Sequence, residues 1–141
     1  MLQTQTKPMS TPEPSSNENC PQIHSIAWNE LITPDPAAAI AFYGGLFGWT
    51  TEKFTGGPVE YTLFKHGDKM FGGVMAPPMP GIPPHWLNYV AVANLEATIE
   101  KAVSLGAKVC AGPMSIGEAG RIAIIQDPQG AGIGLHEAPA Q

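Results

Sequence analysis

The sequence is poor in charged residues, and it contains no long hydrophobic run. Charged residues make up 13% of the 141 residues, and the net charge is −5. The chain therefore offers no basic surface to a nucleic-acid backbone or to an anionic membrane. A membrane-spanning helix needs roughly 18 or more consecutive apolar residues, and no such stretch occurs. We expect neither nucleic acid nor a membrane as a partner.

Cysteine is also scarce, because Cys20 and Cys110 are the only two in the chain. They show neither the CxxC pattern nor the Cys/His spacing of a zinc site. Disulfides are rare in reducing compartments. We interpret the pair as unrelated thiols of a cytoplasmic protein.

The first residues are polar and rich in proline. Residues 1–21 contain no apolar run long enough for a signal peptide. Such a segment buries too little apolar surface to offset the entropy lost on ordering. We predict a disordered tail at 1–21, followed by a single domain at 22–138.

Glycine and proline are abundant, at 16 and 15 residues, which favours short strands and many turns. In the first half, residues 22–76, the pattern predicts a strand near Ile23–Ile32 and then a helix. Asp35 is a suitable N-cap, Pro36 suits the first helical position and Gly48 suits a left-handed C-cap. Three strands follow, at Trp49–Phe54, Val59–Lys65 and Lys69–Met75.

A connector with five prolines, residues 77–84, precedes a second half that repeats this order at 85–138. Asn94 caps the second helix, Gly106 ends it, and three further strands follow it. The caps Asp35 and Asn94 are 59 positions apart, and Gly48 and Gly106 are 58 apart. Near-equal offsets at both helix ends indicate a structural duplication. The prediction is an α+β fold of two βαβββ modules.

Two sequence motifs resemble those of a known family. Residues 35–49, DPAAAIAFYGGLFGW, are similar to the first-helix pattern of the vicinal-oxygen-chelate superfamily, which includes glyoxalases, bleomycin-resistance proteins and extradiol dioxygenases. Residues 120–131, GRIAIIQDPQGA, are similar to its last hairpin. The phrases around Trp28 and His85 match a metal-poor, glyoxalase-like subgroup. The resemblance implies a curved mixed sheet with a half-barrel cleft, and a homodimer that sometimes exchanges modules.

In metal-bearing relatives, the resemblance implies four cleft ligands that hold Fe, Mn, Ni or Zn, one from the first and one from the last strand of each module. Counting from the motifs places these positions at Trp28, Gly73, Leu87 and Gly134. None of these side chains binds a divalent metal, so we expect no metal cofactor. A shift of two residues keeps the strand face. This shift gives an alternative metal set, Glu30, His85 and His136. The structural alternative is that Glu30 is a polar group at the cleft mouth, His85 a residue at the linker edge and His136 a residue at a strand end.

Without a metal, strand alternation predicts an aromatic, apolar cleft beside a single carboxylate. Such a hollow suits a small hydrophobic or aromatic molecule. Glu30 is the candidate general base, because a buried carboxylate requires a reason. A salt bridge from Glu30 to Arg121 or Lys65 is the structural alternative, and the aromatic residues could simply fill the core. The candidate ligand-binding residues are Trp28, Phe71, Leu87, Tyr89, Gly134 and His136.

Three functions remain open at this point. The first is a binding module for a small molecule in a metal-free cleft. The second is a metal-dependent lyase, isomerase or dioxygenase that uses the displaced ligand set. The third is an interaction subunit whose dimer surface is the functional part. The sequence leaves open whether the protein is an enzyme.

Overall fold

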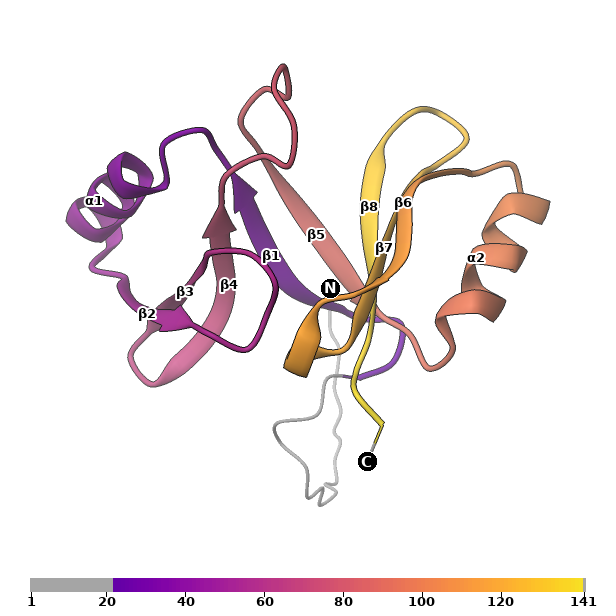
Figure 1. Cartoon of the computed structure of the whole chain (residues 1–141), viewed down its shortest axis with the longest axis horizontal. Coiled ribbons are helices and arrows are strands. Elements are labelled where there is room, and N and C mark those ends of the chain that lie inside the picture. The colour runs from indigo at the N-terminus through magenta and orange to yellow at the C-terminus, as the bar shows by residue number, and fades with distance from the viewer. Residues whose placement is uncertain (1–21, 141) are drawn as a thin grey trace, which may run out of the picture.

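Eight strands form one curved mixed sheet, and two helices lie at its two sides (Figure 1). The computed structural model describes residues 22–140, so the tail predicted at 1–21 lies outside the described residues. The elements are β1 Ile26–Ile32, α1 Pro36–Phe47, β2 Thr50–Phe54, β3 Tyr61–His66, β4 Lys69–Met75, β5 His85–Ala91, α2 Leu95–Ser104, β6 Lys108–Ser115, the 3-10 turn η1 Gly117–Ala119, β7 Arg121–Gln126 and β8 Gly132–Glu137. The order βαβββ occurs twice, and the predicted α+β fold is confirmed.

The two modules meet at the centre of the sheet. The strand order is β2-β3-β4-β1-β5-β8-β7-β6, with β1 and β5 antiparallel. Asn29 of β1 pairs with Asn88 of β5, and the Asn88 amide donates to Asn29 Oδ1 at 2.7 Å. These residues are 59 apart, which is the offset of the helix caps. A local twofold axis between two equivalent residues therefore relates the modules.

Both helices begin where their caps predict. Asp35 Oδ1 accepts the N–H of Ala38 at 3.1 Å, and Gly48 ends α1 with φ of 77°. Asn94 Oδ1 accepts the N–H of Ala97 at 2.9 Å. Side-chain acceptors at these positions satisfy N–H groups that a helix leaves unpaired in its first turn. Among residues 22–140, no helix is long and apolar enough to cross a membrane.

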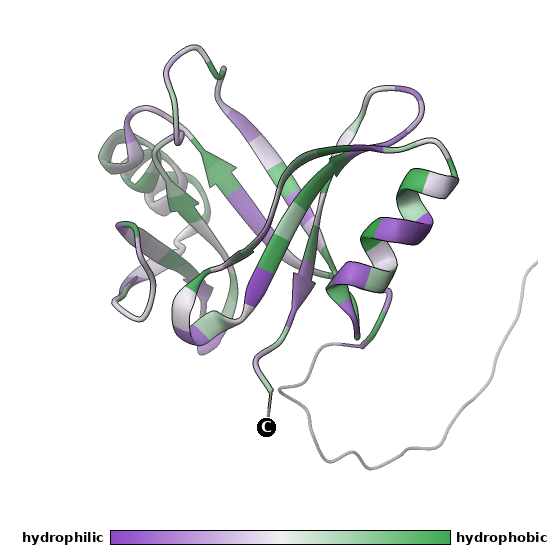
Figure 2. Ribbon diagram, turned by 45° about the vertical axis from the view of Figure 1, so that its right-hand side comes forward, coloured by the Kyte–Doolittle hydropathy of each residue, from purple (hydrophilic) through white to green (hydrophobic). Residues whose placement is uncertain are grey.

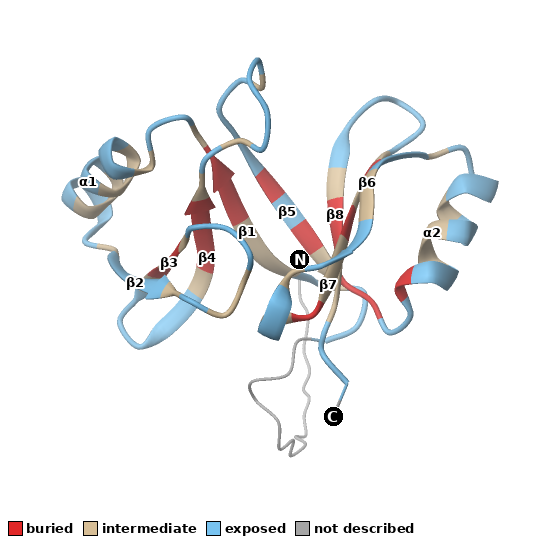
Figure 3. Ribbon diagram, in the orientation of Figure 1, coloured by how far each residue is buried: buried red, intermediate tan, exposed pale blue. Residues whose placement is uncertain are grey.

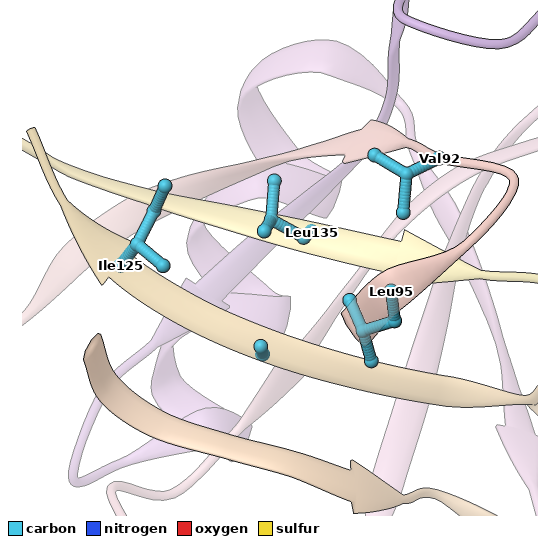
Figure 4. Close-up of a cluster of buried hydrophobic side chains, with 5 residues drawn as sticks. Val92, Leu95, Ile125 and Leu135 are labelled. Carbon is cyan, nitrogen blue, oxygen red and sulfur yellow. The ribbon is translucent and has the colours of Figure 1, made fainter. Parts of the chain in front are cut away.

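Three apolar clusters fill the two faces of the sheet, and the buried stretches follow the central strands (Figure 3). One cluster lies between α2 and β5, β7 and β8; Leu95 and Leu135 belong to it (Figure 4). A second lies under α1 and contains Phe64 and Val74. The third lies on the opposite face, which we call the inner face, and contains Leu87 and Tyr89.

Candidate functional site

The inner face carries one buried carboxylate, that of Glu30. This residue is 8% exposed. Tyr61 Oη donates to Glu30 Oε1 at 3.0 Å, and Tyr89 Oη donates to Glu30 Oε2 at 3.0 Å. Trp28 Nε1 donates to Tyr61 Oη at 2.8 Å. Three aromatic side chains from three strands thus form a continuous hydrogen-bonded chain around one carboxylate. We call these four residues the Glu30 cluster.

Glycine on the neighbouring strands makes room for the two tyrosine rings. A Cβ atom built on Gly73 would lie within 2.4 Å of the Tyr61 ring and hydroxyl. A Cβ on Gly134 would lie 2.4 Å from the Tyr89 ring. The register pairs Glu30 with Gly73 and Tyr89 with Gly134. At these two positions, where the family resemblance implied metal ligands, the inner face instead has a glycine covered by a tyrosine.

Burial dominates the electrostatics of the cluster. Removal from water raises the pKa of the Glu30 carboxyl, and hydrogen bonds from Tyr61 and Tyr89 and the charge of His85 offset part of that rise. Burial and the negative charge of Glu30 together raise the pKa values of both tyrosine hydroxyls. The tyrosines therefore remain protonated donors, and Glu30 is the group of the cluster that changes charge nearest neutral pH.

Most of the predicted cleft residues come together here. Trp28 pairs with Tyr89 across β1 and β5, and Glu30 pairs with Leu87. Leu87 and Tyr89 are 5% and 3% exposed, so these side chains already fill the space around Glu30. Met75 and Ile82 pack against the apolar cluster that contains Leu87 and Tyr89. The inner face of the isolated chain is therefore occupied by its own side chains at this point.

Phe71 does not lie on the inner face, so the expected position of this residue is corrected. The β3–β4 register pairs Phe64 with Gly72 and Lys65 with Met70, which leaves Phe71 as an extra, bulged residue. Its ring packs instead against Phe64 and Trp49 under α1, with ring centroids 6.1 and 4.5 Å apart respectively. Alternation fails here because a bulge changes the face by one residue.

The displaced metal set is not brought together either. His85 begins β5, whereas His136 pairs with Ala91 at the end of β5. Six residues of strand separate the two levels, about 20 Å at roughly 3.3 Å per residue. His85 Nδ1 lies 2.9 Å from the Pro83 carbonyl oxygen, and His136 Nε2 lies 2.6 Å from that of Ala119. Within residues 22–140, no group of three or more His, Cys, Asp or Glu side chains is placed to hold a metal.

The salt bridge considered for Glu30 is also absent. Arg121 binds Glu96 with two nitrogens at 2.6 and 2.7 Å, and it binds Glu137 as well. Lys65 pairs with Glu52 at 3.3 Å. Arg121 joins α2 to β7 and β8. The chain's single arginine thus has a structural role at the helix, away from Glu30.

Tyr61 is the member of the cluster that sequence reasoning missed. The sequence predicts a strand from Val59, and β3 itself begins at Tyr61. Nothing in the pattern distinguishes Tyr61 from the other residues of this strand. The available signal was Gly73 on the adjacent strand, since a glycine inside a strand often marks the close approach of another group. The pattern did not indicate which ring would fill that space.

Two loops, one from each module, meet at residues 55–60 and 116–120, and we call them the strap. The backbone N–H of Glu118 donates to the Gly56 carbonyl at 2.9 Å. A Cβ on Gly117 would lie 2.0 Å from Gly56 O, so only glycine allows this approach. The strap loops of module one and module two lie side by side between the arms of the sheet (Figure 1). Tyr61 directly follows the first loop and contacts Phe54, with ring centroids 6.4 Å apart.

Comparisons with known proteins agree with this geometry. The model of the Glyoxalase/Bleomycin resistance protein/Dioxygenase superfamily matches residues 22–135. A Mycobacterium bovis protein whose name describes it as a candidate glyoxylase, CFP32, is 44% identical over 108 residues, which are 76% of this chain and 41% of that protein. The anthracycline biosynthesis protein DnrV of Streptomyces peucetius is 33% identical over 74% of this chain and 44% of its own length. The chain thus spans about two fifths of the curated relatives it matches.

Solved structures show the same fold at low sequence identity. Methylmalonyl-CoA epimerase from Mycobacterium tuberculosis has a TM-score of 0.60 and 20% identity, covering 82% of this chain and 88% of that one. A methylmalonyl-CoA epimerase in complex with methylmalonyl-CoA and NH4+ has a TM-score of 0.62 and 17% identity, covering 84% and 97%. At these identities the likeness establishes the architecture alone.

Proposed function

Because the chain belongs to the Glyoxalase/Bleomycin resistance protein/Dioxygenase superfamily, we propose that it binds a small hydrophobic or aromatic molecule at the Glu30 cluster, without a metal. The single observation that carries the proposal is a buried carboxylate whose only direct side-chain partners, among the described residues, are two tyrosine hydroxyls. The family's metal does not fit here, because the implied ligand positions are Trp28, Gly73, Leu87 and Gly134. No step of the proposal uses a metal.

The position of Tyr61 defines the class of ligand. Its ring lies on Gly73, and its hydroxyl donates to Glu30 Oε1 and accepts from Trp28. If the Tyr61 ring moves aside, it leaves a flat space with an acceptor at one end and an indole N–H beside it. A planar molecule with a hydroxyl group satisfies both groups, because the hydroxyl donates to Glu30 and accepts from the indole N–H, whereas a carboxylate would be repelled by ionised Glu30.

A catalytic role for Glu30 is the second candidate, and its raised pKa favours it. A carboxylate whose pKa lies nearer neutrality is a better general base, because it matches the proton affinity of weakly acidic substrates more closely. A substrate that displaces Tyr61 would place its own acidic C–H or O–H beside Oε1. Tyr89 would keep Oε2 and hold the carboxylate in position.

We also propose that the protein is cytoplasmic and that it forms a homodimer. Cys110 is a free, exposed thiol on β6, which suits a reducing environment. Neither statement is needed for binding at the Glu30 cluster.

Replacing Glu30 with Gln tests the binding proposal. With 2-naphthol as the probe in titration calorimetry, we expect wild type to bind and E30Q to bind at least 10-fold more weakly, because a neutral amide is a weaker acceptor than a carboxylate. The matched anion 2-naphthoate should bind wild type more weakly than 2-naphthol does. E100Q is the control, since Glu100 is an exposed residue of α2, on the opposite side of the sheet from the Glu30 cluster.

The pH dependence of stability provides a second test with the E30Q variant. A raised pKa means that the folded state binds the Glu30 proton more tightly than the unfolded state does, so wild type loses stability as pH rises above the ordinary pKa of a glutamate, 4.5. E30Q should lack this loss, so the difference in free energy of unfolding between the two proteins should shift in favour of E30Q as pH rises toward neutrality. Glu96, whose pKa is lowered to about 2 by Arg121, titrates below this window in both proteins. Equal affinities for 2-naphthol in wild type and E30Q would reject the proposed site.

Replacing Gly117 with Ala tests whether the strap controls access. Gly117 has φ of 79°, and its Cβ would meet the Gly56 carbonyl, so G117A should separate the two loops. We expect 2-naphthol to associate at least several-fold faster with G117A in stopped-flow fluorescence. G81A is the matched control, since Gly81 has φ of 91° with no atom within 4 Å of its Cβ. Unchanged association in G117A, or equal acceleration in G81A, would show that the strap does not gate the site.

A further inference from the structure

The two helices occupy equivalent places in the duplicated fold, but their outer surfaces differ. Over its ten residues, α2 carries Glu96, Glu100 and Lys101, all exposed, and it shows hydrophilic bands in Figure 2. The twelve residues of α1, PAAAIAFYGGLF, include no charged residue. None of the α1 residues is buried, although the helix is apolar on all sides. A helix with that composition normally has both faces covered.

Large apolar side chains gather on this exposed surface. Phe42, Leu46 and Phe47 are 60%, 57% and 53% exposed. Trp86 of β5 is 39% exposed and lies beside the helix, with its indole N–H donating to Tyr43 Oη at 3.3 Å. We call Phe42, Leu46, Phe47 and Trp86, with the small residues between them on the helix, the α1 face.

The α1 face is continuous. The rings of Phe42, Phe47 and Trp86 have centroids 4.9, 6.2 and 5.6 Å from that of Tyr43. Between the large side chains lie Ala38, Ala41 and Gly45, all exposed, and a Cβ on Gly45 would meet no atom within 4 Å. Small residues at helical spacing let a second helix approach closely, while the flanking rings pack around it.

The area of the α1 face matches what a modest dimer needs. At roughly 150–250 Å² for a fully exposed aromatic ring, the large side chains leave on the order of 400 Å² uncovered. The small helix residues bring the face to roughly 600 Å² per copy, which doubles to the roughly 1,200 Å² at which specific interfaces begin. Lone patches of this size are at the upper end for a monomer.

We propose that the α1 face binds the α1 face of a second copy of this chain, with the two helices packed across a twofold axis. An isologous contact requires a surface that is complementary to itself. A helix without charged residues meets this requirement, because it places no like charges opposite each other across the twofold axis. The α2 surface suits such a contact less well, because it would remove the exposed charged residues Glu100 and Lys101 from water.

Sedimentation velocity of the full chain from 1 to 200 μM tests the interface. Wild type should shift from monomer to dimer within this range, and F42E/L46E should raise the dissociation constant at least 10-fold, since each dimer would bury four carboxylates. The matched control is V103E, because Val103 is a 51% exposed apolar residue on α2. Both positions in the α1 variant are exposed, so circular dichroism and the melting temperature should show an intact fold.

Three outcomes would overturn this proposal. The first is a wild type that stays monomeric at 200 μM. The second is a dimer that survives F42E/L46E, which would place the interface elsewhere. The third is equal loss of the dimer in V103E. A monomeric wild type would also overturn the homodimer proposed above, but none of these results bears on binding of 2-naphthol at Glu30, so the ligand site and the interface are tested separately.

Discussion

Phe64→Ala is expected to lower the free energy of unfolding by about 3–5 kcal/mol, the usual cost of removing a buried aromatic ring. Phe64 is 0% exposed. Its ring lies among those of Tyr43, Trp49, Phe71 and Trp86, at centroid distances between 5.3 and 6.3 Å. Because these rings belong to α1 and three further segments, they cannot all move inward to close the void. Urea unfolding monitored by circular dichroism measures the change.

Phe42→Ala is the matched control for this loss. Phe42 is the same residue type, but it is 60% exposed on α1, so its removal from a monomer should change stability by less than about 0.5 kcal/mol. The comparison must be made at a protein concentration at which the chain is monomeric, since the α1 face is also the proposed dimer contact. A Phe64→Ala variant within 1 kcal/mol of wild type would mean that the cluster under α1 is loosely packed.

The double variant Y61F/Y89F should cost about 3 kcal/mol at neutral pH, the second large effect. Both substitutions keep the rings on Gly73 and Gly134 and remove only the two hydroxyls that donate to Glu30. Hydrogen bonds to a charged group contribute roughly 1.5–3 kcal/mol each, and a buried carboxylate without donors is strongly disfavoured. Trp28 also loses its acceptor, Tyr61 Oη.

The direction with pH separates this effect from a packing defect. Without donors the pKa of Glu30 rises further, so the carboxyl takes up a proton and the loss in stability shrinks as pH falls toward 5. Adding E30Q to Y61F/Y89F should recover part of the loss at neutral pH, because the buried charge is then absent. A loss of the same size at pH 5 and pH 7.5, with no recovery in the triple variant, would contradict the role assigned to the hydroxyls.

Local signals in the sequence determined where the helices begin and end. Asp35 and Asn94 each place an acceptor where a helix has unpaired N–H groups, and Gly48 can adopt the left-handed conformation that ends α1. These effects act within a few residues, so they are readable without tertiary structure. The equal spacing of the caps then predicted the duplication, which appears in the pairing of Asn29 with Asn88.

Register and packing decided the site, because they join residues far apart in the chain. Sequence alternation identified Glu30 and its face. It placed Phe71 on the wrong face because a bulge at that point depends on pairing with Phe64 and Lys65. Tyr61 reaches Glu30 because Gly73 leaves space on a different strand, and no local pattern records which side chain fills it. The sequence pattern allowed His85 and His136 to be placed in one metal site, whereas the length of β5 keeps the two side chains apart.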